Sequence, residues 1–212
     1  AIHDRDELFE LIRRADAAGL QVALHAIGDK AVHWALDAFE RAREANGRRD
    51  TRHRIEHAQI IAPADVERFG ALGVVASLQP SHWTDDMRWL ERRIGVRSVN
   101  CGPYRSLVEA GAHVALGSDW YVEPLDPMAS LCGAVAPRDG GQEVSMQRAV
   151  SDYTLGSAFA EFQEHHKGVI APGMLADMVL LSQDIFKLPP EDISQTKAEM
   201  TIVGGRVIPY MR

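Results

Sequence analysis

Short apolar runs alternate with longer amphipathic segments between residues 4 and 136, and this alternation restricts the possible folds more than any other feature of the sequence. The runs typical of strands are 20–25, 52–57, 74–79 and 113–119. The segments with helical spacing of apolar residues are 4–19, 29–46, 63–73, 104–111 and 126–136. Strands that alternate with helices predict βαβ units, in which parallel strands share one sheet. The predicted fold class is therefore α/β.

Several of these segments begin with residues that favour a helix start. We expect Asp4 and Asp29 to cap the first two helices, because an aspartate side chain accepts hydrogen bonds from the free backbone N–H groups there. Pro63 is expected in the first turn of the third helix. Residues 80–103 show no clear pattern, so we expect an irregular stretch, and residues 145–163 again have a helical pattern.

The pattern changes after residue 167. Two β-prone regions follow, at 168–182 and 198–211, and the Gly204-Gly205 pair indicates a hairpin. We therefore divide the chain into residues 1–167 and a small β part, residues 168–212.

Composition narrows the function classes. The formal charge is −7, from 23 basic and 30 acidic residues, which argues against nucleic acid as a partner. No apolar stretch is long enough to span a membrane, and the N-terminus has no signal-peptide pattern. The two cysteines, Cys101 and Cys132, suggest no disulfide framework and fit a reducing compartment, so we expect a cytoplasmic protein.

Polar side chains end three of the predicted strands. His25, His57 and Asp119 stand at the carboxyl ends of their runs, where α/β proteins place binding residues. Two imidazoles and a carboxylate suit Zn²⁺ or another divalent metal. Taken singly, each histidine could be a structural residue and Asp119 could cap a turn, so both interpretations stay open. His82, after the run 74–79, adds a fourth polar group near the same edge.

Four aromatic residues fall near the predicted loops of this edge: Trp83, Trp89, Trp120 and Tyr121. They would either line a fairly apolar substrate pocket or pack beneath the loops. We retain Trp120, with His82, as a candidate substrate contact.

Longer motifs carry a resemblance. The segments "HAIGDKAVHWALDAFE", "RIEHAQ", "SLQPSHWTDDM", "LGSDWYVEPLDPM" and "GMLADMVLL" together resemble the amidohydrolase superfamily, in its amidohydrolase family 3 branch. The resemblance implies a distorted (β/α)₈ TIM-like barrel beside a β-sandwich. Residues 1–167 would supply barrel strands five to eight, and residues 168–212 would supply part of the sandwich.

The resemblance also implies roles for single residues. His25, His57 and Asp119 would be metal ligands, and Asp119 would in addition take a proton from the attacking water. His82 would contact the substrate. The implied activity is metal-dependent hydrolysis of C–N bonds, amide-like and non-peptide, in a small molecule.

The chain departs from the family pattern in one respect. It contains no His-x-His pair, which the family's first strand supplies, and no counterpart of the fourth-strand ligand. A complete barrel takes about 250 residues, so we expect the C-terminal half of a larger enzyme. Such a half would need self-association or its missing N-terminal half. The alternative function is therefore a truncated, catalytically incomplete fragment that folds only by association and has no turnover.

Overall fold

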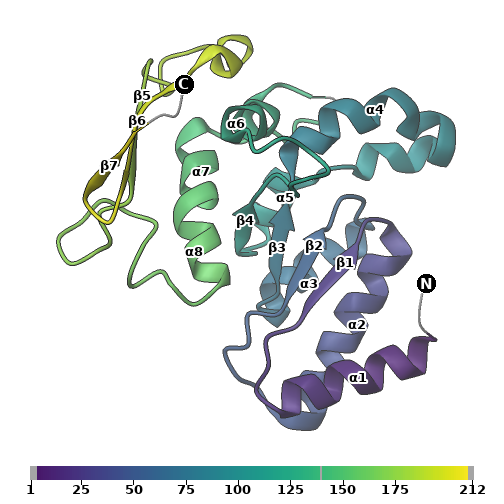
Figure 1. Cartoon of the computed structure of the whole chain (residues 1–212). Helices are drawn as coiled ribbons and strands as arrows, with labels where there is room; N and C mark the ends of the chain where they lie inside the picture. The colour runs from purple at the N-terminus through teal and green to yellow at the C-terminus, as the bar shows by residue number, and fades with distance from the viewer. Residues whose placement is uncertain (1–3, 139, 210–212) are drawn as a thin grey trace.

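A four-stranded parallel sheet organises the first part of the chain. The computed structural model describes residues 4–138 and 140–209, with only the backbone of residues 84–88. The strands lie in the order β1-β2-β3-β4 and all pairs are parallel (Figure 1). Their bounds are Ala23–Ala26, Arg54–His57, Val75–Leu78 and Val114–Leu116. The predicted α/β class is confirmed, and within the described ranges the sheet is open rather than closed into a barrel.

Helices connect these strands as predicted, with one exception. The α-helices are α1 Arg5–Ala17, α2 Asp29–Asn46, α3 Pro63–Leu72, α4 Pro80–Ile94, α5 Tyr104–Glu109, α6 Pro127–Val135, α7 Met146–Ser151 and α8 Ser157–Ala160. The exception is α4, which fills most of the stretch expected to be irregular and is followed by the 3₁₀ helix η1, Gly95–Asn100.

Of the three predictions for helix starts, two are confirmed. Asp4 caps α1, since its carboxylate accepts a hydrogen bond from the Asp6 N–H at 2.9 Å. Pro63 opens α3. The prediction for Asp29 was wrong, because α2 begins at Asp29 itself, one residue earlier than a cap there would require, and Gly28 occupies the cap position. Asp29 lies instead in the first turn, where its carboxylate pairs with Arg97 at 3.0 Å.

The two faces of the sheet have different environments. Leu24, Ile55, Ala76 and Val114 lie on the face that packs into the main core with the helices. The opposite face carries His25, which pairs in register with Glu56, and Glu56 pairs in turn with Ser77. This opposite face is exposed on β1 and becomes buried toward β4, where Phe159 and Ala160 cover Val75 and Ala115.

The C-terminal part forms a separate antiparallel sheet at one end of the molecule (Figure 1). Its strands are β5 Met178–Leu181, β6 Ala198–Val203 and β7 Arg206–Ile208, and the predicted hairpin at Gly204-Gly205 joins the last two. Residues 168–177 precede β5 without strand structure, because Pro172 and Gly173 form a turn there. The 3₁₀ helix η3, Pro190–Gln195, returns to the main core through Ile193, which is fully buried.

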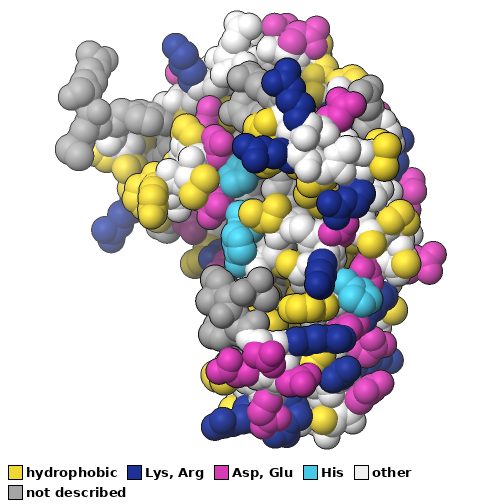
Figure 2. Space-filling view, turned by 90° about the vertical axis from the view of Figure 1, so that its right-hand side faces the viewer, with side chains coloured by type: hydrophobic (Ala, Val, Ile, Leu, Met, Phe, Trp, Pro, Cys, Tyr) yellow, Lys and Arg dark blue, Asp and Glu magenta, His cyan; other side chains and the backbone are white. Residues whose placement is uncertain are grey.

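Acidic and basic side chains interleave across the face that Figure 2 shows, and histidine side chains reach its surface near the middle. This mixed pattern agrees with the modest net charge. Within residues 4–138 and 140–209, every helix is too short or too polar to cross a bilayer.

Candidate metal centre

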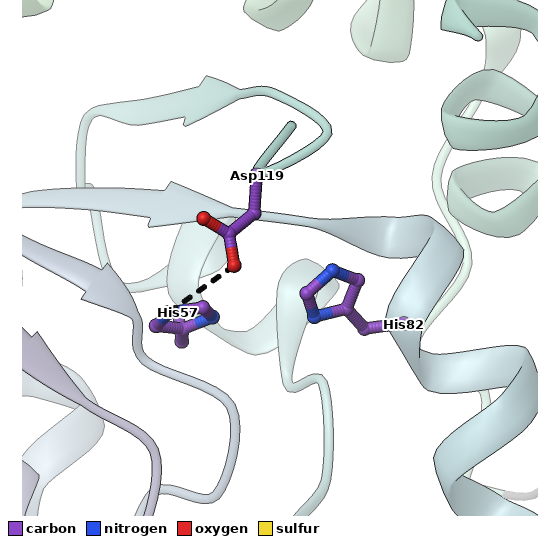
Figure 3. A group of neighbouring side chains, drawn as sticks. All are labelled: His57, His82 and Asp119. Carbon is purple, nitrogen blue, oxygen red and sulfur yellow. Dashed lines mark ion pairs between the residues drawn. The ribbon is translucent and has the colours of Figure 1, made fainter. Parts of the chain in front are cut away.

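Three predicted or suspected site residues meet at the carboxyl edge of the parallel sheet. One ligand atom each of His57, His82 and Asp119 lies within 4.8 Å of the other two (Figure 3). His57 is the last residue of β2, Asp119 follows β4, and His82 lies in the first turn of α4. Segments that are distant in the sequence therefore converge on one point.

The backbone of β2 turns His57 toward this point. In register, His57 pairs with Ala26, which is buried on the helix-covered face, whereas His25 lies on the opposite face. Regular alternation would keep the two histidines apart. His57 and Ala58 adopt left-handed conformations, with φ of +72° and +41°, and the two imidazole rings come to lie 4.6 Å apart, edge to face.

Asp119 has a similar departure from regular backbone. Its φ is +58°, and its Oδ2 lies 3.9 Å from Nε2 of His57. Left-handed conformations cost energy for residues other than glycine and tend to gather at functional sites. Two more occur at Arg52 and Phe162, at the other end of the sheet, where the guanidinium lies 4.3 Å from the Phe162 ring centroid.

The electrostatic setting keeps His57 neutral. Burial lowers the pKa of its imidazole, and the nearby His25 lowers that pKa further, while Asp119 acts in the opposite direction. A neutral imidazole is the form that binds a metal.

Two buried ring nitrogens at the site have no hydrogen-bond partner among the residues that the structure describes. They are Nδ1 of His57 and Nε2 of His82. Buried polar atoms are nearly always paired, so these two are consistent with a ligand that accepts their lone pairs. The donor set of two imidazoles and one carboxylate fits Zn²⁺ or a similar divalent ion.

The remaining predicted residues lie at or near this cluster. His25 is exposed and contacts His57, but it is not one of the three whose ligand atoms converge. Trp120 follows Asp119 and is 65% exposed, and Tyr121 beside it is more exposed still. Trp83, in contrast, is buried, with its ring 6.2 Å from that of Tyr104.

His82 lies near this edge as expected, but the helix that carries it, α4, was not predicted. The signal was present: Pro80 favours a helix start, and the apolar residues Trp83, Leu90 and Ile94 recur at spacings of seven and four. These three side chains pack in or against the main core.

Comparisons with known proteins assign the chain to a family. The sequence profile of the amidohydrolase family matches residues 1–209. Protein LONG AFTER FAR-RED 3 of Arabidopsis thaliana is 40% identical over 97% of this chain and 37% of its own length. The N-substituted formamide deformylase of Arthrobacter pascens is 27% identical over 99% of this chain and 40% of its own length.

A solved structure is similar as well. An uncharacterized metal-dependent hydrolase from Pyrococcus horikoshii OT3 superposes with a TM-score of 0.76 at 30% identity, over 90% of this chain and 39% of that one. The chain thus spans less than half the length of each of these relatives. With the profile match over nearly all of its residues, the chain belongs to the amidohydrolase family, as the motifs predicted.

Proposed function

We propose that this chain supplies the metal-binding edge of a hydrolase that cleaves C–N bonds in amide-like, non-peptide small molecules. The observation that carries the proposal is the convergence of His57, His82 and Asp119, with two buried ring nitrogens that lack partners among the described residues. Family membership and the name of the similar N-substituted formamide deformylase support the reaction class.

The proposed ligands are His25, His57 and Asp119, from the resemblance, and the geometry adds His82 as a competitor for the place of His25. When bound, Zn²⁺ or another divalent cation polarises the substrate carbonyl and lowers the pKa of water. The other role proposed for His82 is contact with the substrate, together with Trp120.

Asp119 is positioned to transfer the proton of the attacking water. Its side chain is 37% exposed, so water reaches the carboxylate, while Oδ2 points toward His57. We propose that Oδ2 accepts the proton of the attacking water and returns it to the leaving nitrogen, which are successive general-base and general-acid steps.

We further propose that β1–β4 correspond to strands five to eight of a TIM-like barrel, and that β5–β7 belong to a β-sandwich, with the boundary near residue 167. The exposed face of β1 supports this, since a complete barrel would bury it. A cytoplasmic location stays a prediction that rests on the two cysteines, both of which are free.

A second candidate is a fragment without turnover, which folds by association. The absence of a His-x-His pair favours it for this chain on its own. Under this alternative, the cluster binds metal weakly or not at all until a second half is present.

The deciding experiment is metal analysis of the chain after gel filtration without chelator. The proposal predicts an equimolar amount of zinc or a similar metal in the unsubstituted protein, and loss of that metal in His57→Ala. Comparing His25→Ala with His82→Ala then shows which histidine binds the metal, because only the ligand's loss should release it. A folded sample without metal would favour the fragment instead.

Amides and N-formyl compounds are the substrates to screen next, with Asp119→Asn as the inactive control. Hydrolysis that persists in the Asp119→Asn protein would overturn the role proposed for this carboxylate.

A further inference from the structure

Helix α6 is structurally linked to two residues of the metal cluster, Asp119 and His82. The loop that leaves Asp119 leads into α6 through Asp126, whose carboxylate caps the helix by accepting hydrogen bonds from Met128 N–H and Ala129 N–H. The same helix packs on the first turn of α4, which carries His82 (Figure 1). A displacement of α6 would therefore be felt at both Asp119 and His82.

The contact between α6 and α4 is made by backbone. Gly133 is buried in α6, and a Cβ atom built there would lie 2.8 Å from the carbonyl carbon of Pro80 and closer still to its oxygen. Real Cβ atoms do not approach a backbone carbonyl so closely. Only glycine at position 133 therefore lets α6 pack this closely against Pro80, which is two residues before His82.

Conformational freedom does not explain this glycine. Gly133 lies inside a regular helix, without the left-handed backbone that glycines elsewhere in the chain adopt. Inside a helix, glycine is less favourable than alanine. The close approach to Pro80 supplies a reason for a residue that helix propensity disfavours.

The first turn of α4 is also held from other directions. Trp83 is 1% exposed, the guanidinium of Arg138 lies 4.3 Å from its ring centroid, and the Tyr104 ring lies 6.2 Å away. Gly102 approaches the same indole, since a Cβ there would lie 2.7 Å from it. Because these contacts hold Trp83, the first turn of α4 is not free to move as a whole. A side-chain atom added at Gly133 would displace Pro80 and with it the position of His82.

We propose that Gly133 is a positioning residue: its backbone contact with Pro80 sets the place of His82 relative to His57 and Asp119. The effect of this contact on metal affinity rests on the proposed function, whereas its effect on the position of the His82 ring does not. The inference therefore has one test that needs no metal and one that does.

The first test compares the histidine ring signals of the metal-free chain by NMR in Gly133→Ala and Gly70→Ala. The control is matched, because a Cβ at Gly70 would meet the backbone carbonyl of Ala110 in the same way, at the contact between α3 and α5. Gly133→Ala should shift the ring signals of His82 and leave those of His53 in place. Gly70→Ala should leave His82 unchanged. Unchanged His82 signals in a folded Gly133→Ala protein would overturn the inference.

The second test measures Co²⁺ affinity. Gly133→Ala should weaken binding about tenfold or more, the usual cost of disturbing a residue that orients a metal ligand. In a His82→Ala background the added Gly133→Ala should change affinity no further, because the contact acts through His82. An equal further loss in that background would contradict the inference. If the unsubstituted chain binds no Co²⁺, the proposed function fails while the NMR test still stands.

A variant that removes atoms covers the case in which Gly133→Ala does not fold. Trp83→Phe loosens the same turn from the other side without adding volume. It should also shift the His82 ring signals, and unchanged signals would show that the packing of this turn does not place the ring.

Discussion

The surroundings of His57 suit the role of metal ligand that we propose for it. It is buried, left-handed in its backbone, and its Nδ1 lacks a partner among the described residues. His57→Ala should lower metal affinity by more than about tenfold, the loss typical when a residue that only orients a ligand is substituted. Competition with a chelator measures this. His33→Ala is the control, since that imidazole is half-exposed on α2 and pairs with Asp65. Equal affinities in the two variants would remove His57 from the site.

Asp119 can be tested apart from the fold because it lies at an exposed strand end. Asp119→Asn keeps the size of the side chain and removes its capacity to hold a proton. In the full-length enzyme, kcat should fall about a hundredfold or more, the usual contribution of a general acid–base group. The thermal unfolding midpoint should change little. A rate near that of the unsubstituted enzyme would show that another group moves the proton.

His53 predicts how stability depends on pH. Its Nδ1 accepts the Val22 N–H at 3.1 Å, so Nε2 carries the proton and donates to Asp16 at 3.1 Å. Burial lowers the pKa of His53 below its ordinary value of 6.5, against the opposing effect of Asp16. Below that value the unfolded chain takes up a proton that the folded chain resists.

The free energy of unfolding should therefore fall as pH drops below 6.5, until the folded pKa is reached. His53 contributes at most about 1.4 kcal/mol per pH unit within this window. Urea unfolding at several pH values measures the slope, and His53→Asn should make it shallower. An unchanged slope would mean that other groups carry the dependence, such as His57 and His113, whose pKa values desolvation also lowers.

Residue types at strand ends could be foreseen, but their exact directions could not. The positions of His57 and Asp119 followed from apolar runs that end in polar residues. The sequence does not reveal that both adopt left-handed backbone, which is what brings His57 beside His25 despite the register. Such conformations depend on surrounding contacts, not on the residues themselves.

At the level of elements, α6 depends on a single cap. Asp126→Ala removes the acceptor for two backbone N–H groups and should lower the free energy of unfolding by about 1 kcal/mol. Asp126→Asn should keep most of the stability, because the amide oxygen still accepts. Urea denaturation of both variants measures the difference. Equal losses would show that the charge, not the hydrogen bond, is what matters.

Most helices and strands were predictable because their apolar periods are regular and their caps are ordinary. Helix α4 was missed because its sequence is rich in charged residues, and among the side chains that the structure describes there, two apolar ones, Trp83 and Leu90, are buried and Ile94 is half-buried. The pattern over 145–163 was predicted as one helix, whereas α7 and α8 are separated by a π-helical turn, η2, at Asp152–Gly156. Gly156 lies there against the backbone carbonyl of Val114, so tertiary contact rather than local preference shapes the turn.

At the scale of the whole molecule, the sequence predicted a parallel sheet and a small β part, and both are present. It could not predict how far the sheet would curve or close, because closure depends on what pairs with the edge strands, and local apolar patterns do not determine that. Each outer strand, β1 and β4, has one described neighbour. Open edges of this kind favour pairing with another chain.

The β5–β7 sheet offers a second surface for association with another chain. Val179 of β5, Thr201 of β6 and Ile208 of β7 are paired in register and so form one row on one face. The outer two are 52% and 44% exposed, and Val203 beside them is 51% exposed. Contiguous exposed apolar surface tends to be covered by another molecule. We therefore expect the isolated chain to elute in gel filtration as an oligomer, at a mass above its own 23.4 kDa.

Substitutions in the row of Val179, Thr201 and Ile208 test whether association occurs through this face or through apolar surface elsewhere. Val179→Thr with Ile208→Thr keeps β-branched residues that suit a strand but removes apolar surface. This double variant should shift elution toward the monomer, and the shift should grow on dilution. Leu11→Gln is the control, because Leu11 is similarly exposed but lies on α1. If the unsubstituted chain is already monomeric at high concentration, the exposed row does not drive association. If only Leu11→Gln disperses the oligomer, association occurs through the helical side instead.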